Sequence, residues 1–242
     1  VEMIIREKRN ANRNLSYEDI AVLYRTNAQS RAFEGELRKN NIPYRIYGGT
    51  SFYQRKEIKD TLAYFRLAVN PKDNEALLRA LSFPARGIGD TTMKKVTLCA
   101  IENNQPYLEV MRHPDDYPLE MSGPMKKKIS AFAAMIDELS AQSEEMDAFS
   151  FAEMLLRQTG VTTALMMDRT VEGIDRAQNV QELLNAIREF VTQRTNEGID
   201  YTPITDFLSE VSLMTDQDDN QADTADRVTL MTVHAAKGLE FP

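Results

Sequence analysis

Two short stretches near the start of the chain have the pattern of buried strands. The apolar run from Ile20 to Tyr24 is bounded by polar residues, and residues 42–49 form a second short apolar run that ends at a glycine pair. Between them, residues 28–40 carry apolar side chains at helical spacing, while residues 1–10 have the pattern of a helix end. A strand, a helix and a strand with short connections predict a parallel α/β unit.

From residue 55 onward the spacing of apolar residues becomes helical. Ile58, Leu62 and Phe65 share one face of a predicted helix that ends before Pro71. Further stretches of the same kind follow, separated by breaks rich in Pro, Gly and Asp. They cover residues 74–82, 91–103, 125–143, 150–160, 176–195 and 204–214. The middle of the chain is therefore predicted to be almost entirely α-helical.

The pattern changes again towards the C-terminus. Residues 216–226 include five aspartates and few apolar side chains, which predicts a flexible acidic loop, and the β-branched run 228–233 predicts a returning strand. The predicted fold class is α/β: a partial parallel-sheet domain made of two segments, 1–70 and 227–242, interrupted by a mostly α-helical inserted domain at 71–215.

The composition narrows the classes of protein that fit. Of the 242 residues 42% are hydrophobic and 27% are charged, which is typical of a globular protein. Cys99, His113 and His234 have no metal-ligand spacing, so we expect no structural metal. No apolar run approaches the roughly 18 to 20 residues that span a bilayer, and the first residues lack a signal-peptide layout. We expect a monomer in the cytoplasm without a membrane partner.

The net charge of −8 alone argues against a nucleic-acid partner, but the charge is unevenly distributed. Residues 24–95 contain 14 basic and 7 acidic residues, a local charge of +7, and the rest of the chain carries −15. One explanation is that helical faces differ in charge for no functional reason. The other is a basic surface that contacts phosphates.

Four segments resemble superfamily I ATP-dependent DNA helicases of the UvrD/PcrA/Rep type, in the order of that family. VTLMTVHAAKGLEFP at 228–242 resembles their motif V, and DIAVLYRTNAQSR at 19–31 resembles motif IV. GGTSFYQRKEIKDTLAYFRLAVNP at 48–71 resembles the segment that follows motif IV, and FPARGIGDTT at 83–92 resembles a turn of the inserted domain. These segments cover about a third of the chain, and the helical remainder agrees in length and pattern only.

The resemblance implies an architecture and an activity. In this family two RecA-like motor domains, each interrupted by an insertion, bind ATP with Mg²⁺ between them and move 3′ to 5′ along single-stranded DNA to unwind a duplex. The two ends of this chain would belong to the second motor domain (2A), and its helical middle to the insertion (2B). The partners would be single-stranded and duplex DNA, with repair or replication proteins as further candidates.

The resemblance also implies roles for nucleotide-binding residues. Tyr24 matches an aromatic residue that stacks on adenine, and Arg25 matches the arginine that reaches the γ-phosphate. A guanidinium suits a phosphoryl group whose charge spreads in the transition state. Glu240 matches a carboxylate that contacts the ribose, and Gly238 lets backbone N–H groups approach phosphate. The alternative is a strand-edge tyrosine beside an arginine that pairs with a carboxylate.

Two groups of residues would contact DNA. Thr232 and His234 match residues that touch the single strand, and Arg66 matches a position farther along it, although a structural histidine and an ordinary helix arginine are the alternatives. The second group has the form of a helix-hairpin-helix phosphate clamp, in which bare glycine N–H groups and a helix start face phosphate; an ordinary capped turn is the alternative. It comprises Arg86, Gly87, Ile88, Gly89, Thr92, Lys94 and Lys95.

Other features carry less weight or are missing. Asp137-Glu138 imitates the acidic pair that holds Mg²⁺ in such motors, but it lies within a predicted helix, and Lys126 to Lys128 fit a solvated helix start. The sequence contains no G-x-x-x-x-G-K-[ST] and no strand-borne Asp-Glu pair. We therefore predict that this fragment binds no cofactor tightly and is inactive alone, unlike the full-length parent. The alternatives are a regulatory module that binds DNA or docks proteins, and part of a helicase-nuclease.

Overall fold

The computed structural model describes residues 7, 11, 16–220 and 226–239, and only the backbone of 216–220. The helix end expected within residues 1–10 falls, except for Glu7, outside the described residues, as does Glu240.

The chain forms two compact units, which we describe separately. Unit 1 contains the described residues of 1–58, 170–182 and 210–242, and unit 2 contains 59–169 and 183–209. The domain boundaries expected from the sequence, at residues 70, 215 and 226, remain predictions.

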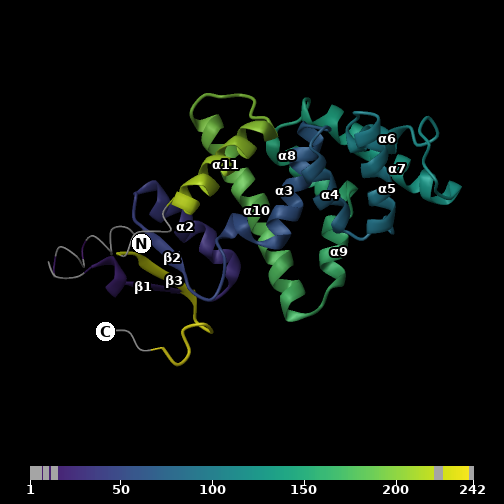
Figure 1. The fold of residues 1–242 in the computed structure, drawn as a ribbon. Helices are drawn as coiled ribbons and strands as arrows, with labels where there is room; N and C mark the ends of the chain where they lie inside the picture. The colour runs from purple at the N-terminus through teal and green to yellow at the C-terminus, as the bar shows by residue number, and fades with distance from the viewer. Residues whose placement is uncertain (1–6, 8–10, 12–15, 221–225, 240–242) are drawn as a thin grey trace. The chain divides into compact units, whose positions relative to one another are not determined.

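Unit 1 is built on a small parallel sheet (Figure 1). The strands are β1 (Ala21–Tyr24), β2 (Tyr44–Ile46) and β3 (Val228–Thr232), and β3 lies between the other two and parallel to both. Helix α2 (Ser30–Lys39) connects β1 to β2. The predicted parallel α/β unit is confirmed, but its strands β1 and β2 are not neighbours, because the distant β3 separates them.

Burial explains the position of β3 in the middle of the sheet. Four of its five residues are buried, as is typical of a parallel strand covered on both faces. The core of unit 1 gathers side chains from the strands and α2, and the short 3₁₀ helices η1 (Tyr17–Asp19), η2 (Asn27–Gln29) and η3 (Phe52–Gln54) lie in its connections. The buried members of this core are Tyr24, Leu37, Ile42, Tyr44, Val228 and Leu230.

Unit 2 is helical, and some of its helices extend into unit 1. The helices α3, α10 and α11 begin in one unit and end in the other. Helices α6 and α9 were not predicted from the sequence. The helices are α3 (Lys56–Val69), α4 (Asn74–Ser82), α5 (Asp90–Glu102), α6 (Tyr107–Arg112), α7 (Gly123–Ser143), α8 (Ala148–Gln158), α9 (Val161–Met167), α10 (Val171–Asn196) and α11 (Ile204–Asn220).

The core of unit 2 is formed by apolar helix faces. Tyr64 and Phe65 on α3 are fully buried, and the ring of Phe65 lies 6.3 Å from that of Phe151 on α8. The buried hydroxyl of Tyr64 donates to the carbonyl oxygen of Ala80 on α4. The predicted fold class, a partial RecA-like sheet domain interrupted by a helical insertion, is confirmed. None of the helices in the described ranges is long and apolar enough to cross a bilayer.

Residues 216–220 differ from the expectation of a loop. Helix α11 continues through them to Asn220. Aspartate lowers helix propensity only moderately, so a helix anchored by packed residues such as Val211 can extend into a polar stretch.

Candidate functional site at the strand ends of unit 1

The carboxyl ends of β1 and β3 lie side by side in unit 1. Tyr24 pairs in register with Thr232, and the N–H of Val233 donates to the carbonyl oxygen of Tyr24 at 2.9 Å. The sheet thus brings together two segments that are 208 residues apart in sequence. In parallel α/β sheets, ligands bind outside the carboxyl ends of the strands.

Tyr24 is packed into the core. Its side chain is only 5% exposed, and its ring is stacked at 6.1 Å on that of Phe33. Burial raises the pKa of its hydroxyl. Tyr24 also contributes to the wall of a cavity in the same unit. Little of its ring is therefore accessible for stacking on a base.

Arg25 lies on the surface, on a loop whose backbone is held in place. The backbone N–H groups of Arg25 and Thr26 both donate to the side-chain oxygen of Gln29, at 2.9 and 3.1 Å. The side chain of Arg25 is exposed, and it makes no hydrogen bond or ion pair within the described part of the chain. Its guanidinium is available to a ligand, although its backbone is fixed.

Behind this loop lies Arg55, which the sequence reasoning did not select. It is 9% exposed and donates to the carbonyl oxygen of Asn27 at 2.8 Å and to the hydroxyl of Ser30 at 2.5 Å. It also donates to the side-chain oxygen of Asn179 on α10 at 2.9 Å. Burial lowers the pKa of its guanidinium, with Glu34 acting in the opposite direction.

A polar cavity of about 390 Å³ adjoins these residues. Its wall includes both signs of charge, which suits a ligand with several polar groups better than a purely apolar one. The charged residues that line it are Arg55, Lys56, Glu57, Glu172, Asp175 and Arg176, and the neutral ones include Tyr24, Asn27, Gly48, Asn179 and Thr232.

The turn after β3 carries the predicted DNA-contact residues of unit 1. The hydroxyl of Thr232 accepts from the N–H of Ala235 at 3.1 Å and thereby closes the first part of the turn. His234 is exposed, and Gly238 adopts a φ of +88°, a conformation that favours glycine. Glu240, the predicted ribose contact, lies outside the described residues.

The candidate phosphate clamp lies in unit 2, at the start of α5. Gly89 is the N-cap of α5, and Gly87 has a φ of +67°, a left-handed conformation that favours glycine. A Cβ on Gly87 would also lie only 3.0 Å from the ammonium nitrogen of Lys128. Lys94 is exposed and pairs with no described residue. Ile88 and Thr92 are half-buried.

Arg86, which was predicted to contact DNA, is directed into unit 2. Its guanidinium donates to the Tyr64 hydroxyl at 3.0 Å and to the carbonyl oxygen of Thr159 at 2.8 Å. It also lies over the rings of Tyr64 and Phe132, at 5.8 and 5.3 Å from their centroids. These contacts fix the residue that precedes Gly87. They give Arg86 a structural role in addition to any contact with DNA.

Two other predicted DNA contacts have partners inside the chain. Lys95 donates to the carbonyl oxygen of Glu120 at 2.5 Å. Arg66, with 44% of its side chain exposed, pairs with Asp73 at 2.7 Å and with Glu75 at 3.6 Å. Their roles in DNA binding remain predictions.

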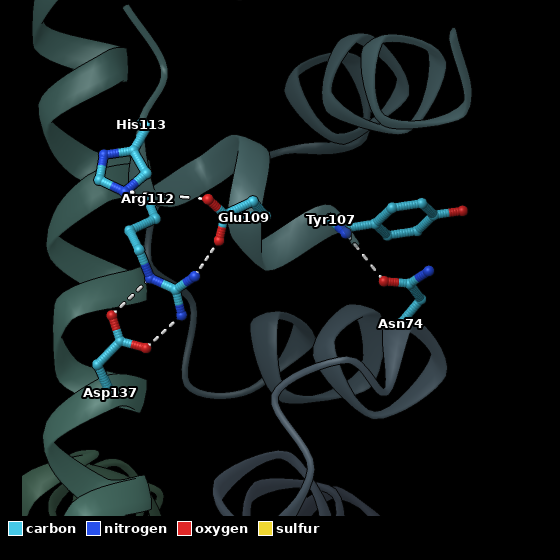
Figure 2. Close-up of polar contacts among 6 residues, drawn as sticks. All are labelled: Asn74, Tyr107, Glu109, Arg112, His113 and Asp137. Atoms are coloured by element: carbon cyan, nitrogen blue, oxygen red, sulfur yellow. Dashed lines mark hydrogen bonds and ion pairs between the residues drawn. The ribbon is translucent and has the colours of Figure 1, made fainter. Parts of the chain in front are cut away.

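The Asp137-Glu138 pair lies in the middle of α7, as the sequence indicated. Figure 2 shows the carboxylate of Asp137 facing the guanidinium of Arg112. Arg112 donates to the two carboxylate oxygens at 2.8 and 2.5 Å. Arg112 also bonds to Glu109, and Glu109 in turn lies 3.9 Å from His113. Asp137 raises the pKa of Arg112. Within the described residues, no group of three or more His, Cys, Asp or Glu side chains is arranged to hold a metal ion.

Asn179 is the other residue that sequence reasoning missed. It is 3% exposed and lies on α10 beside the buried Val180. A polar residue on the apolar face of a helix is the signal that was available, because buried amides require partners. The sequence alone could not show that these partners would be Arg55 and Glu57.

The sequence is similar to known proteins over nearly its whole length. The sequence matches the family described as UvrD-like helicase C-terminal domain over residues 1–242. Among curated proteins, it is 36% identical over 242 residues to the ATP-dependent DNA helicase PcrA of Staphylococcus aureus strain Mu50, covering 100% of this chain and 32% of that protein. It is 40% identical over 234 residues to the protein of the same name from Leuconostoc citreum, covering 95% of this chain and 31% of that protein. The chain thus spans about a third of these relatives' length.

Proposed function

Because the chain belongs to the family of UvrD-like helicase C-terminal domains, we propose that it supplies the second motor domain, with its helical insertion, to a longer ATP-dependent DNA helicase. The relatives named ATP-dependent DNA helicase PcrA support this proposal, since they match nearly the whole chain. The observation that carries it is the exposed guanidinium of Arg25, which has no partner among the described residues. It lies on a backbone that Gln29 holds at the carboxyl end of β1.

Arg25 is the residue to which we assign the nucleotide contact. A planar guanidinium donates in a fixed fork that matches phosphate oxygens, and an arginine that reaches a transferring phosphoryl group stabilises the charge of the transition state. When bound, ATP with Mg²⁺ supplies the phosphoryl group and the energy of its transfer. The resemblance assigns the P-loop and the Mg²⁺ ligands to the other motor domain, so this chain completes the site without forming it.

The other nucleotide contacts receive different degrees of support. Gly238, with its left-handed backbone, suits the close approach of phosphate or ribose to the turn after β3. The buried ring of Tyr24 supports adenine stacking less well than the exposed guanidinium supports phosphate binding. We therefore propose that Tyr24 acts mainly by packing β1 on α2, which fixes the start of the Arg25 loop.

DNA binding is assigned to both units. In unit 1, the exposed His234 and the turn that Thr232 closes offer donors to a single strand. In unit 2, the turn at Gly87 and Gly89 presents bare backbone beside the ammonium group of Lys128, and the exposed Lys94 lies on α5, which begins after this turn. Such a surface binds phosphates without reading base sequence. This supports a grip on duplex DNA.

The nucleotide assignment is tested by Arg25→Ala in the full-length protein. We expect steady-state ATP hydrolysis, stimulated by single-stranded DNA in the unaltered protein, to fall by about 10³-fold or more, as for other arginines that reach the transferred phosphoryl group. Lys39→Ala, which removes an exposed charge at the end of α2, is the matched control and should hydrolyse ATP normally. Full activity of Arg25→Ala would refute the assignment.

A further inference from the structure

The loop that presents Arg25 rests on a buried arginine that takes no part in the proposed chemistry. Arg55 holds the loop at two points, the carbonyl oxygen of Asn27 at 2.8 Å and the hydroxyl of Ser30 at 2.5 Å. Ser30 is completely buried. The guanidinium also lies 5.3 Å from the centroid of the Phe52 ring. Because the two bonds leave from different nitrogens of a rigid fork, they fix the direction as well as the position of this backbone.

Arg55 is in turn held by the first part of α10. Asn179, which is 3% exposed, uses both ends of its amide: its oxygen accepts from Arg55 at 2.9 Å, and its nitrogen donates to a carboxylate oxygen of Glu57 at 2.5 Å. If the amide were flipped, its nitrogen would face the Arg55 donor and its oxygen would face the Glu57 carboxylate, so only one orientation of the side chain satisfies both bonds. Asn179 therefore links Arg55 to Glu57.

The same part of α10 touches the Arg25 loop and the following helix at two more places. The side-chain nitrogen of Asn27 donates to the carboxylate of Asp175 at 3.3 Å, and Arg31 on α2 donates to Glu182 at 2.6 Å. All of these residues belong to unit 1. Three residues of this part of α10 thus bond to the loop, to Arg55 behind it and to α2: Asp175, Asn179 and Glu182.

We propose that Arg55 and Asn179 are positioning residues for ATP hydrolysis, which orient the loop from behind so that Arg25 faces the phosphoryl group. This inference rests on the proposed function of Arg25. The side chain of Arg25 has no bond of its own to the described residues, so the loop backbone sets the point from which it reaches a ligand. A shift of about 1 Å in a group that contacts the transition state lowers a rate by up to about 10²-fold.

The first test is Asn179→Ala in the full-length protein, with ATP hydrolysis measured at saturating single-stranded DNA. We expect kcat to fall by about 10- to 100-fold while the KM for ATP stays nearly constant. This split arises because a misdirected Arg25 weakens the transition state more than the bound ATP. Because partial unfolding would also lower the apparent kcat at constant KM, kcat is calculated per folded protein, with the folded fraction taken from the melting curve of each variant.

A polarity exchange separates positioning from simple loss of a buried bond. Asn179→Asp alone places a new carboxylate against the carboxylate of Glu57. The two negative groups repel each other, and we expect kcat to fall. In the double variant with Glu57→Gln, the new amide at position 57 donates to the new carboxylate at position 179. That carboxylate also still accepts from Arg55. We expect the double variant to recover at least about 10-fold of the lost kcat, consistent with the fold-changes of a positioned contact.

Val180→Ala is the stability control, because Val180 is the buried apolar neighbour of Asn179 on α10. It should lower the melting temperature but leave kcat nearly unchanged. The inference is overturned if Asn179→Ala keeps the kcat of the unaltered protein, or if Val180→Ala loses as much kcat at an equal loss of melting temperature. If the unaltered full-length protein shows no ATP hydrolysis with DNA, it is the proposed function that has failed.

Discussion

Two arginines of the chain, Arg25 and Arg86, have opposite surroundings. The guanidinium of Arg25 has no partner among the described residues, whereas that of Arg86 donates to Tyr64 and Thr159 and lies over two aromatic rings. Both were selected from the sequence as ligand contacts. Their environments now separate a residue that is available to a ligand from one that fixes a turn.

Arg86→Ala should therefore destabilise the protein. It removes two hydrogen bonds from a charged donor and two ring contacts, and the buried Tyr64 hydroxyl loses one partner. We expect the free energy of unfolding to fall by about 2–4 kcal/mol, measured by urea denaturation. Lys94→Ala, at the exposed fifth residue of α5, is the control and should change it by less than about 0.5 kcal/mol. Equal losses for both variants would contradict the structural role of Arg86.

The strand ends and the tight turn could be located from the sequence because neighbouring residues define them. The side chains that contact them from distant parts of the chain could not. The sequence pointed to Tyr24, Arg25 and Gly87, which depend on strand ends and a tight turn. It did not point to Arg55, since Arg55 was read as the start of an ordinary helix. Its partner Asn179 is 124 residues away, and only the folded chain brings them to 2.9 Å.

At the scale of elements, the long amphipathic helices and the apolar strands were predicted well. Which strand lies beside which in the sheet was not predicted. The sequence placed β1, α2 and β2 correctly, but β3 lies between the two strands because parallel pairing does not depend on nearness in the chain. The short helix α6 follows an Asn-rich break, and α9 contains β-branched residues, so neither has a strong helical pattern. Such elements depend on packing.

One helix start offers a test that depends on pH. The Asp147 carboxylate caps α8 by accepting from the N–H groups of Phe149 and Ser150, at 3.0 and 3.1 Å. Burial tends to raise its pKa, but the hydrogen bonds outweigh burial and the pKa is lowered from 3.8. Asp147→Ala should cost about 1 kcal/mol of unfolding free energy at neutral pH, and Asp147→Asn, which keeps a capping oxygen, much less.

The sign of the pH effect follows from the lowered pKa. The folded protein holds the Asp147 proton less tightly than the unfolded chain, so the ionised carboxylate stabilises the fold fully above pH 3.8. This contribution is lost as the pH falls below 3.8 through the folded pKa. Urea denaturation of the unaltered protein and Asp147→Ala should therefore converge at low pH. A difference that stays constant down to pH 2 would show that the charge has no part in the cap.

At the scale of the whole molecule, the charge distribution and the two units have a common explanation in the proposed function. The +7 of residues 24–95 covers the Arg25 loop of unit 1 and, in unit 2, the turn at Gly87 and the start of α5, where Lys94 lies. The net charge of the remaining sequence is −15. A chain of net charge −8 can therefore still present basic surfaces to phosphate. This account requires that one protein uses Arg25 for ATP and Lys94 for duplex DNA.

The most direct test is strand separation by the full-length protein on a duplex with a 3′ single-stranded tail, with ATP hydrolysis measured in the same samples. We predict that the unaltered protein separates the strands only with ATP and prefers a 3′ tail to a 5′ tail. Arg25→Ala should abolish hydrolysis and separation together, whereas Lys94→Glu should slow separation and leave hydrolysis stimulated by single-stranded DNA intact. Absence of ATP-dependent separation by the unaltered protein, or equal loss of both activities in Lys94→Glu, would contradict the account.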